Sequence, residues 1–147
     1  MKLELKDFQE VAVDQLFKKL APAKREVAEG SDRQAVILAA PTGWGKTVIT
    51  AALIEEILTG SDRIAAEPDA VFLWLSDQPM LNEQSKKRIA SASSKLGNND
   101  LVIVDSDFDR ETFAGGKLYF LNTQKLGKDK LLTSAKGDKR TYTIWET

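Results

Sequence analysis

The sequence predicts an α/β protein whose parallel sheet is flanked by helices. Short apolar runs alternate with amphipathic stretches along the chain, and a glycine-rich turn joins one of these runs to the helix that follows it. Crossovers of this kind connect parallel strands and place helices on the faces of the sheet. With 147 residues, 42% of them hydrophobic, the chain is long enough for one domain with a real core.

A helix is predicted to open the chain. Asp7 and Glu10 have the spacing of a capping box, in which two side chains satisfy the free N–H groups of a first helical turn. Apolar residues then recur at helical spacing and should form the buried face of this helix. They are Phe8, Ala12, Leu16 and Leu20.

The later elements follow from the same patterns. Residues 34–40 form a short apolar run, which is typical of a strand buried on both faces, and residues 46–58 form a helix that ends at Gly60. Further strands are predicted at 70–75, 101–104 and 117–121, with a helix at 79–92. Loops are expected at 60–68, 97–100, 105–116 and 126–139, and residues 140–147 turn apolar again, like an interrupted element.

Composition excludes several classes of function. The chain has no cysteine and no histidine, so disulfides, thiolate catalysis, histidine triads and the usual zinc sites are ruled out. Its net charge of -1 provides no general attraction to nucleic acid. The N-terminal residues lack a signal peptide, and no run approaches the roughly 20 apolar residues of a membrane span, so we expect a cytoplasmic protein without a membrane partner.

Residues 40–47 carry the strongest functional signal. They read Ala-Pro-Thr-Gly-Trp-Gly-Lys-Thr and match the phosphate-binding loop pattern, except that Ala40 replaces its first glycine. Glycines let successive N–H groups turn toward a phosphate, the lysine reaches the β- and γ-phosphates, and the final hydroxyl helps to hold Mg²⁺. The pattern therefore predicts ATP and Mg²⁺ as ligands, rather than an incidental turn. The predicted binding residues are Thr42, Gly43, Trp44, Gly45, Lys46 and Thr47, with Thr47 also serving the metal.

Two further side chains could serve the nucleotide. The amide of Gln9 matches the hydrogen-bonding edge of adenine, although a solvated glutamine on a helix surface is the simpler interpretation. Trp44 either covers the nucleotide or packs against the protein. Asp105, at the end of an apolar run, could hold Mg²⁺ through water, but strands often end in aspartate, and Ser106 stands where an ATPase normally has a glutamate.

A basic stretch lies near the C-terminal end of the sequence. Between residues 117 and 140 there are seven basic residues and two acidic ones. Such a stretch could follow the phosphates of a nucleic acid, but solvated lysines in a loop give the same pattern.

Four segments together resemble superfamily 2 helicases in type and order: residues 8–9, 40–47, 72–84 and 119–126. The resemblance spans nearly the whole chain and is strongest to the restriction (Res) subunits of type III restriction enzymes. It implies a RecA-like first motor domain in which Gln9 reads adenine. It also implies that the parent protein hydrolyses ATP and translocates on double-stranded DNA, in an endonuclease complex with a DNA methyltransferase or specificity subunit.

The resemblance also suggests contacts to the DNA backbone. The residues at the matching positions are Asn82, Asn122, Thr123 and Gln124. Asp77 departs from the pattern because a carboxylate repels phosphate, so main-chain N–H groups at the next helix start, or Asn82 and Thr123, are the better candidates.

The sequence also departs from the family in one larger respect. Members continue to a strand that ends in Asp-Glu-Ala-His or a close variant, whereas no Asp-Glu pair occurs here. We therefore expect the chain to be the front part of one incomplete RecA-like domain, with residues 1–33 forming a helix with the glutamine motif and 34–147 a partial sheet core. Such a fragment should bind nucleotide without hydrolysing it.

Two other functions fit the residues less well. One is a complete small kinase or nucleotide-binding module that uses Asp105 for magnesium. The other is a DNA-binding module whose phosphate loop is vestigial.

Overall fold

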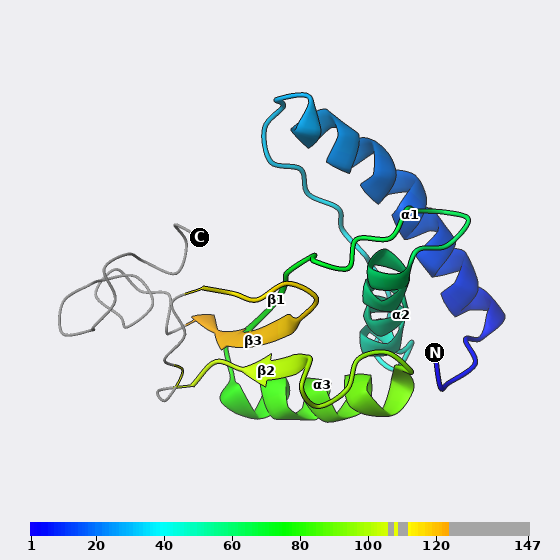
Figure 1. The fold of residues 1–147 in the computed structure, drawn as a ribbon. Helices are drawn as coiled ribbons and strands as arrows, with labels where there is room; N and C mark the ends of the chain where they lie inside the picture. The colour runs from blue at the N-terminus through cyan, green and yellow to red at the C-terminus, as the bar shows by residue number, and fades with distance from the viewer. Residues whose placement is uncertain (106–107, 109–111, 124–147) are drawn as a thin grey trace.

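The computed structural model describes residues 1–105, 108 and 112–123, and within them a parallel sheet is flanked by helices (Figure 1). The predicted α/β fold class is thereby confirmed. The predicted loop at 126–139, the apolar residues 140–147, Ser106 and Gln124 lie outside the described residues. The elements are α1 (Asp7–Ala28), α2 (Lys46–Thr59), β1 (Phe72–Ser76), α3 (Pro79–Ala92), β2 (Leu101–Ile103) and β3 (Leu118–Asn122).

The sheet has the order β1-β3-β2, and both pairings are parallel. Leu118 lies opposite Phe72 on one side and Leu101 on the other, so β3 has a neighbour along both edges. All five residues of β3 are buried. This burial explains why residues 118–121 are apolar in succession rather than at alternate positions, before the polar Asn122.

Each face of the sheet has its own hydrophobic cluster. Leu118 and Phe120 face α3, where they pack with Ile89 and with Ile54 of α2. Tyr119 and Leu121 point to the opposite face, where they pack with Phe108 and neighbouring apolar residues. Successive side chains of a strand point to opposite faces, so alternate residues of β3 belong to separate clusters.

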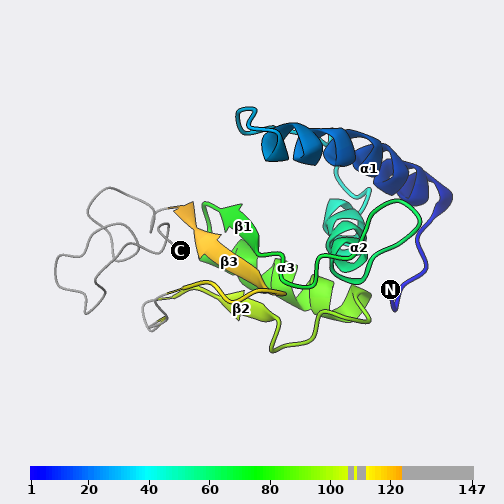
Figure 2. The same cartoon turned by 45° about the horizontal axis from the view of Figure 1, so that its top comes forward.

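Helix α2 lies between α1 on one side and the layer formed by α3 and the sheet on the other (Figure 2). Ala51 and Ile54 face the cluster shared with α3 and the sheet, whereas Ile49 and Ala52 face α1. A helix that is buried on two sides needs apolar residues over most of its circumference. This arrangement fixes the direction of α2, and with it the loop at its N-terminal end.

Helix α1 differs from the prediction in its cap and in its buried face. The capping residue is Lys6, whose N–H donates to Oε1 of Gln9 at 3.1 Å, so Gln9 takes the place expected for Glu10. The buried residues are Gln9, Val13 and Phe17, one position beyond the predicted apolar series. The helix also continues through Pro22 to Ala28.

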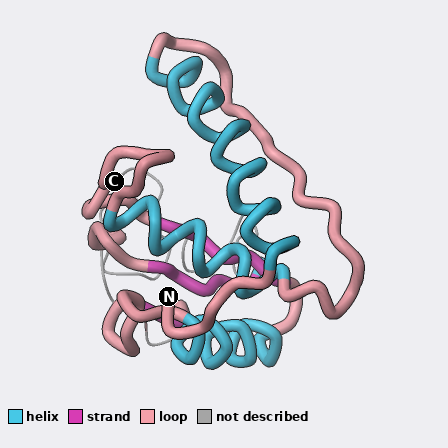
Figure 3. The backbone as a smooth tube through the Cα atoms, turned by 90° about the vertical axis from the view of Figure 1, so that its right-hand side faces the viewer, coloured by secondary structure: helices cyan, strands magenta, loops and turns pink. Residues whose placement is uncertain are grey.

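Residues 34–40 are not a strand in the described structure. They belong to the long loop that leads from α1 back to α2 and runs beside α1 (Figure 3). The side chain of Ile37 is 90% exposed, so the predicted burial on both faces is wrong as well. The physical reason is that no other strand in the described residues pairs with this segment.

Within the described ranges, no helix has the length and the apolar character needed to cross a lipid bilayer.

Candidate functional site at the phosphate loop

The loop before α2 has the backbone shape that its glycines predict. Gly43 and Gly45 have φ angles of 88° and 77°, which side-chain-bearing residues rarely adopt. Gly45 is also the N-cap of α2, and its carbonyl accepts hydrogen bonds from the N–H groups of Val48 and Ile49. The N–H groups of Gly45, Lys46 and Thr47 have no partner within the described part of the chain. Such free N–H groups at a helix start can bind an anion.

The side chain of Lys46 lies over the loop itself. Its Nζ donates to the carbonyl oxygens of Ala40 and Pro41, at 2.8 and 3.2 Å. These carbonyls hold the ammonium group at the N-terminal end of α2. A phosphate that binds the free N–H groups would lie at the same end. Thr47 follows on the first turn of the helix and is half-buried.

Gln9 connects helix α1 to the phosphate loop. It is 8% exposed, and its Nε2 donates to the carbonyl oxygen of Trp44 at 3.1 Å. A Cβ atom at Gly45 would lie only 2.5 Å from Nε2 of Gln9. The backbone angle favours glycine at position 45, and a Cβ atom there would also displace the end of the flexible Gln9 side chain. The alternative of a solvated surface glutamine is wrong, whereas adenine reading by Gln9 stays a prediction.

Trp44 packs against the first turn of α1. Its ring centroid lies 4.8 Å from that of Phe8, and the two rings are inclined by 55°. Both side chains remain partly open, with Trp44 46% and Phe8 37% exposed. The pair is the second contact, after Gln9, that joins the loop to α1. Sequence reasoning placed Phe8 in a buried helix face and missed this contact, although its position directly before Gln9 was a usable signal.

A cavity of ≈ 630 Å³ lies beside the loop. Its volume falls within the range of about 300 to 1,000 Å³ that is usual for small-molecule sites. Trp44 and Ala40 border it together with residues 36–39 and one side of α1. Two lysines of α1, Lys18 and Lys19, line it as well. The cavity thus has an aromatic ring and basic side chains in its lining, whereas Gly45, Lys46 and Thr47 are not among its lining residues.

Asp105 and the phosphate loop line different cavities. Asp105 follows β2, which is the edge strand on the far side of β3 from β1. It lines a different cavity of ≈ 480 Å³, together with Asn82, Glu83 and Asn122. This cavity includes no residue of the phosphate loop, and the cavity beside the loop does not include Asp105. The geometry therefore gives no support to Asp105 as the magnesium acid of this loop.

The structure brings together two of the residues predicted to contact DNA, but it buries them. Asn82 and Asn122 are 3% and 6% exposed and line the same cavity. Oδ1 of Asn82 accepts a hydrogen bond from the hydroxyl of Ser76 at 2.8 Å. Thr123 is exposed, as is Asp77. Two carboxylates, Glu83 and Asp105, border the cavity and would repel a phosphate there.

These features define the class to which the protein belongs. A glycine-rich turn with free N–H groups, followed by a lysine and a threonine at a helix start, beside a parallel sheet, is typical of phosphate-loop α/β proteins. The match to known families then narrows the class. A family model described as type III restriction enzyme, res subunit, matches residues 2–145, and the chain belongs to that family. The family is related to superfamily 2 helicases and has helicase-like, ATP-binding domains of the RecA-like type. No curated protein and no solved structure matched the chain.

Proposed function

We propose that this chain binds ATP with Mg²⁺ through residues 42–47, with Gln9 against the adenine base. The observation that carries the proposal is the loop geometry, in which two glycines with positive φ leave three N–H groups free beside Lys46. In this arrangement Lys46 exchanges its bonds to the carbonyls of Ala40 and Pro41 for the phosphates. The charge-assisted bonds to phosphate are stronger than those to neutral carbonyls.

The residues at the loop also fit a magnesium ion that arrives with the nucleotide. In the described part of the chain, no group of three or more acidic, histidine or cysteine side chains could hold a metal ion. Mg²⁺ usually keeps several waters and takes one or two protein oxygens together with substrate phosphates. The hydroxyl of Thr47 supplies one such oxygen, and the bound ion would neutralise charge on the phosphates.

The wider function follows from the family. We infer that the chain is the nucleotide-binding part of an ATP-dependent DNA translocase of a type III restriction endonuclease. The parent protein would act on double-stranded DNA together with a DNA methyltransferase subunit. Among the described residues, the cavity beside the phosphate loop is lined by no carboxylate that could activate water. We expect the chain to bind ATP and to show negligible hydrolysis.

Calorimetric titration with ATP and Mg²⁺ tests the binding. We expect Lys46→Ala to lower the affinity at least about tenfold, because a charge-assisted contact to phosphate is worth roughly 1.5 to 3 kcal/mol. Lys87→Ala is the matched control, since this exposed lysine lies on α3 and should leave the affinity unchanged. Equal affinities for the unmodified chain and Lys46→Ala would contradict the proposal.

A second experiment separates the proposal from its alternatives. Hydrolysis of ATP that Lys46→Ala abolishes would show a complete enzyme rather than a binding part. Salt-dependent binding of duplex DNA that neither ATP nor Lys46→Ala affects would favour a DNA-binding module with a vestigial loop.

A further inference from the structure

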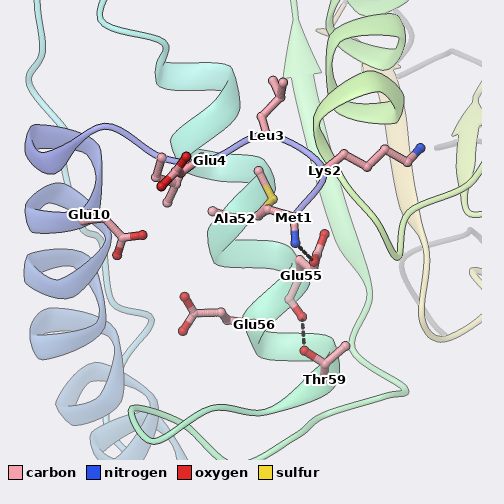
Figure 4. Close-up of a pocket in the computed structure, with 10 residues that line it drawn as sticks. Met1, Lys2, Leu3, Glu4, Glu10, Ala52, Glu55, Glu56 and Thr59 are labelled. Carbon is pink, nitrogen blue, oxygen red and sulfur yellow. Dashed lines mark hydrogen bonds and ion pairs between the residues drawn. The ribbon is translucent and has the colours of Figure 1, made fainter.

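A buried carboxylate on α2 binds the N-terminal amine of the chain (Figure 4). Glu55 is 7% exposed, and its Oε1 forms an ion pair with the α-ammonium group of Met1. Its other partners follow α3: the hydroxyl of Ser93 donates at 2.5 Å, and the N–H and hydroxyl of Ser94 donate at 3.0 and 2.8 Å. The Met1 amine also donates to Oγ of Ser94 at 3.1 Å. One carboxylate therefore joins the N-terminus, α2 and the end of α3.

The N-terminal segment is held along the end of α3 by backbone contacts as well. The N–H groups of Lys2 and Leu3 both donate to the carbonyl oxygen of Ala92, at 2.7 and 3.3 Å. Nζ of Lys2 donates to the carbonyl of Ala90 at 3.1 Å. These bonds bring Met1 to Glu55, which lies 54 residues further along the chain.

The surroundings of Met1 favour a positive charge. A cavity of ≈ 490 Å³ beside it is lined by four glutamates, namely Glu4, Glu10, Glu55 and Glu56. Lys2 also lines this cavity, but its ammonium group is bonded to Ala90. Glu10 and Glu56 lie 3.8 and 3.6 Å from the guanidinium of Arg63, at the side nearer α1. The α-ammonium of Met1 is therefore the cation that compensates Glu55.

The pKa of Glu55 agrees with this geometry. Burial by itself raises the pKa of the carboxyl group. The hydrogen bonds from the Met1 amine, Ser93 and Ser94 outweigh burial and lower the pKa from 4.5 to about 2. Removal of the positive charge leaves the carboxylate buried without its ion-pair partner, which is costly.

We propose that the α-amino group of Met1 is a modification-sensitive site, at which a formyl or acetyl group releases the N-terminal segment from Glu55 and destabilises the packing of α2 against α3. An acyl group converts the ammonium into a neutral amide. The cavity has room for such a small group, so the effect arises from loss of charge rather than from a clash. The proposal is independent of nucleotide binding, although Glu55 lies on the helix that begins at the phosphate loop.

The test compares the chain that begins at Met1 in two forms. One carries a free amine, and the other keeps an N-formyl group because bacterial deformylase is inhibited during expression; intact mass verifies each form. We expect the formyl group to lower Tm by about 5 °C or more. Hydrogen exchange should accelerate at the amides of Lys2, Leu3 and Ser94, which form the bonds described above, and remain unchanged at β3.

Glu55→Gln provides the matched variant. Without the carboxylate the amine has no ion-pair partner, so the formyl group should lower Tm of this variant by less than about 1 °C. Ser94→Ala is the second variant; it keeps the carboxylate, so the formyl group should still lower its Tm by several degrees. Equal Tm values for the two forms of the unmodified chain would overturn the proposal, as would an equal formyl effect in Glu55→Gln. If Glu55→Gln fails to fold, the formyl effect and the exchange at Lys2, Leu3 and Ser94 decide the outcome.

Discussion

Two apolar segments of this molecule have similar composition and opposite environments. Strand β3 is buried at all five positions and lies between two other strands. Residues 34–40 are almost as apolar, yet they form a loop in which alternate side chains are exposed and Ile37 is open to solvent. A strand needs hydrogen-bonding neighbours on its edges as well as apolar side chains. The pattern of a segment shows what it can bury, whereas its neighbours decide whether it does so.

The surroundings of the two segments, namely the sheet and the phosphate loop, differ as well. Helix α3 covers one face of β3 and the cluster around Phe108 covers the other, so the stability of that region comes from packing. The phosphate loop depends on fewer contacts, chiefly the hydrogen bond from Gln9 and the ring of Phe8. The following changes test this difference, starting with the largest expected effect.

Phe120→Ala tests the buried strand. Phe120 is 0% exposed and packs between α3 and Trp74 of β1. Removal of a buried phenyl ring leaves a cavity and should lower the free energy of unfolding by about 3 to 5 kcal/mol. Chemical denaturation monitored by circular dichroism measures this change. A loss below about 1 kcal/mol would mean that β3 is not the centre of the core.

Acid tests the connection between α2 and the N-terminus. The pKa of Glu55 in the folded chain is about 2, below its ordinary value of 4.5. Because the folded-state pKa is lowered, the stabilisation is present above pH 4.5 and is lost as the pH falls toward 2. The difference in Tm between the unmodified chain and Glu55→Gln should therefore shrink through this range. A constant difference would contradict the ion pair.

Gly45→Ala tests the phosphate loop. The φ angle of 77° is unfavourable for alanine, and the new Cβ would meet Nε2 of Gln9 at 2.5 Å. We expect a loss of roughly 1 to 2 kcal/mol of stability and a weaker affinity for ATP. Gly97→Ala is a fair control, because its Cβ would lie 3.5 Å from Oδ2 of Asp100 at an ordinary contact distance. Unfolding and titration experiments on both variants make the comparison, and equal results for them would refute this account.

Phe8→Ala should have a smaller effect on the same loop. An aromatic pair contributes about 0.5 to 1.5 kcal/mol, and both rings here are partly exposed. Trp44 should become more exposed, so its fluorescence emission should shift to longer wavelength. Trp74 also emits, and the shift should therefore vanish in a Trp44→Phe background. A shift that persists in that background would assign it to another tryptophan.

Ile37→Ser should have the smallest effect. This side chain is 90% exposed, so its replacement should change the free energy of unfolding by no more than about 0.5 kcal/mol. Chemical denaturation beside Phe120→Ala gives the direct contrast between the two segments. A loss of 2 kcal/mol or more would show that residues 34–40 are buried in solution, and would remove the difference between them.

The extent to which the sequence predicted this structure depended on how far apart the interacting residues lie. Helices starting at Asp7, Lys46 and Pro79 follow from local periodicity and turn residues, as does the shape of the loop around Gly43 and Gly45. The prediction that residues 34–40 are buried was wrong, because such burial depends on neighbouring strands. The shift of the buried face of α1 to Gln9, Val13 and Phe17 depends on where α2 lies.

The contacts of the candidate site also differ in the sequence separation of their partners. The bond between Lys46 and the carbonyl of Ala40 spans six residues and lies within the motif. The bond from Gln9 to Trp44 spans 35 residues and needs the helix packing. Glu55 gave one weak signal, a charged pair with Glu56 in a mostly apolar helix, but its partners at Met1, Ser93 and Ser94 could not be identified from the sequence.

The open edge of β1 has a practical consequence for handling the protein. In the described structure one edge of β1 has no neighbouring strand, and Leu73 and Leu75 are 40% and 51% exposed. An edge with free backbone groups and apolar side chains is a template for the strands of other molecules. The isolated chain should therefore associate edge to edge at high concentration, and Leu73→Lys would be the substitution of choice to keep it monodisperse.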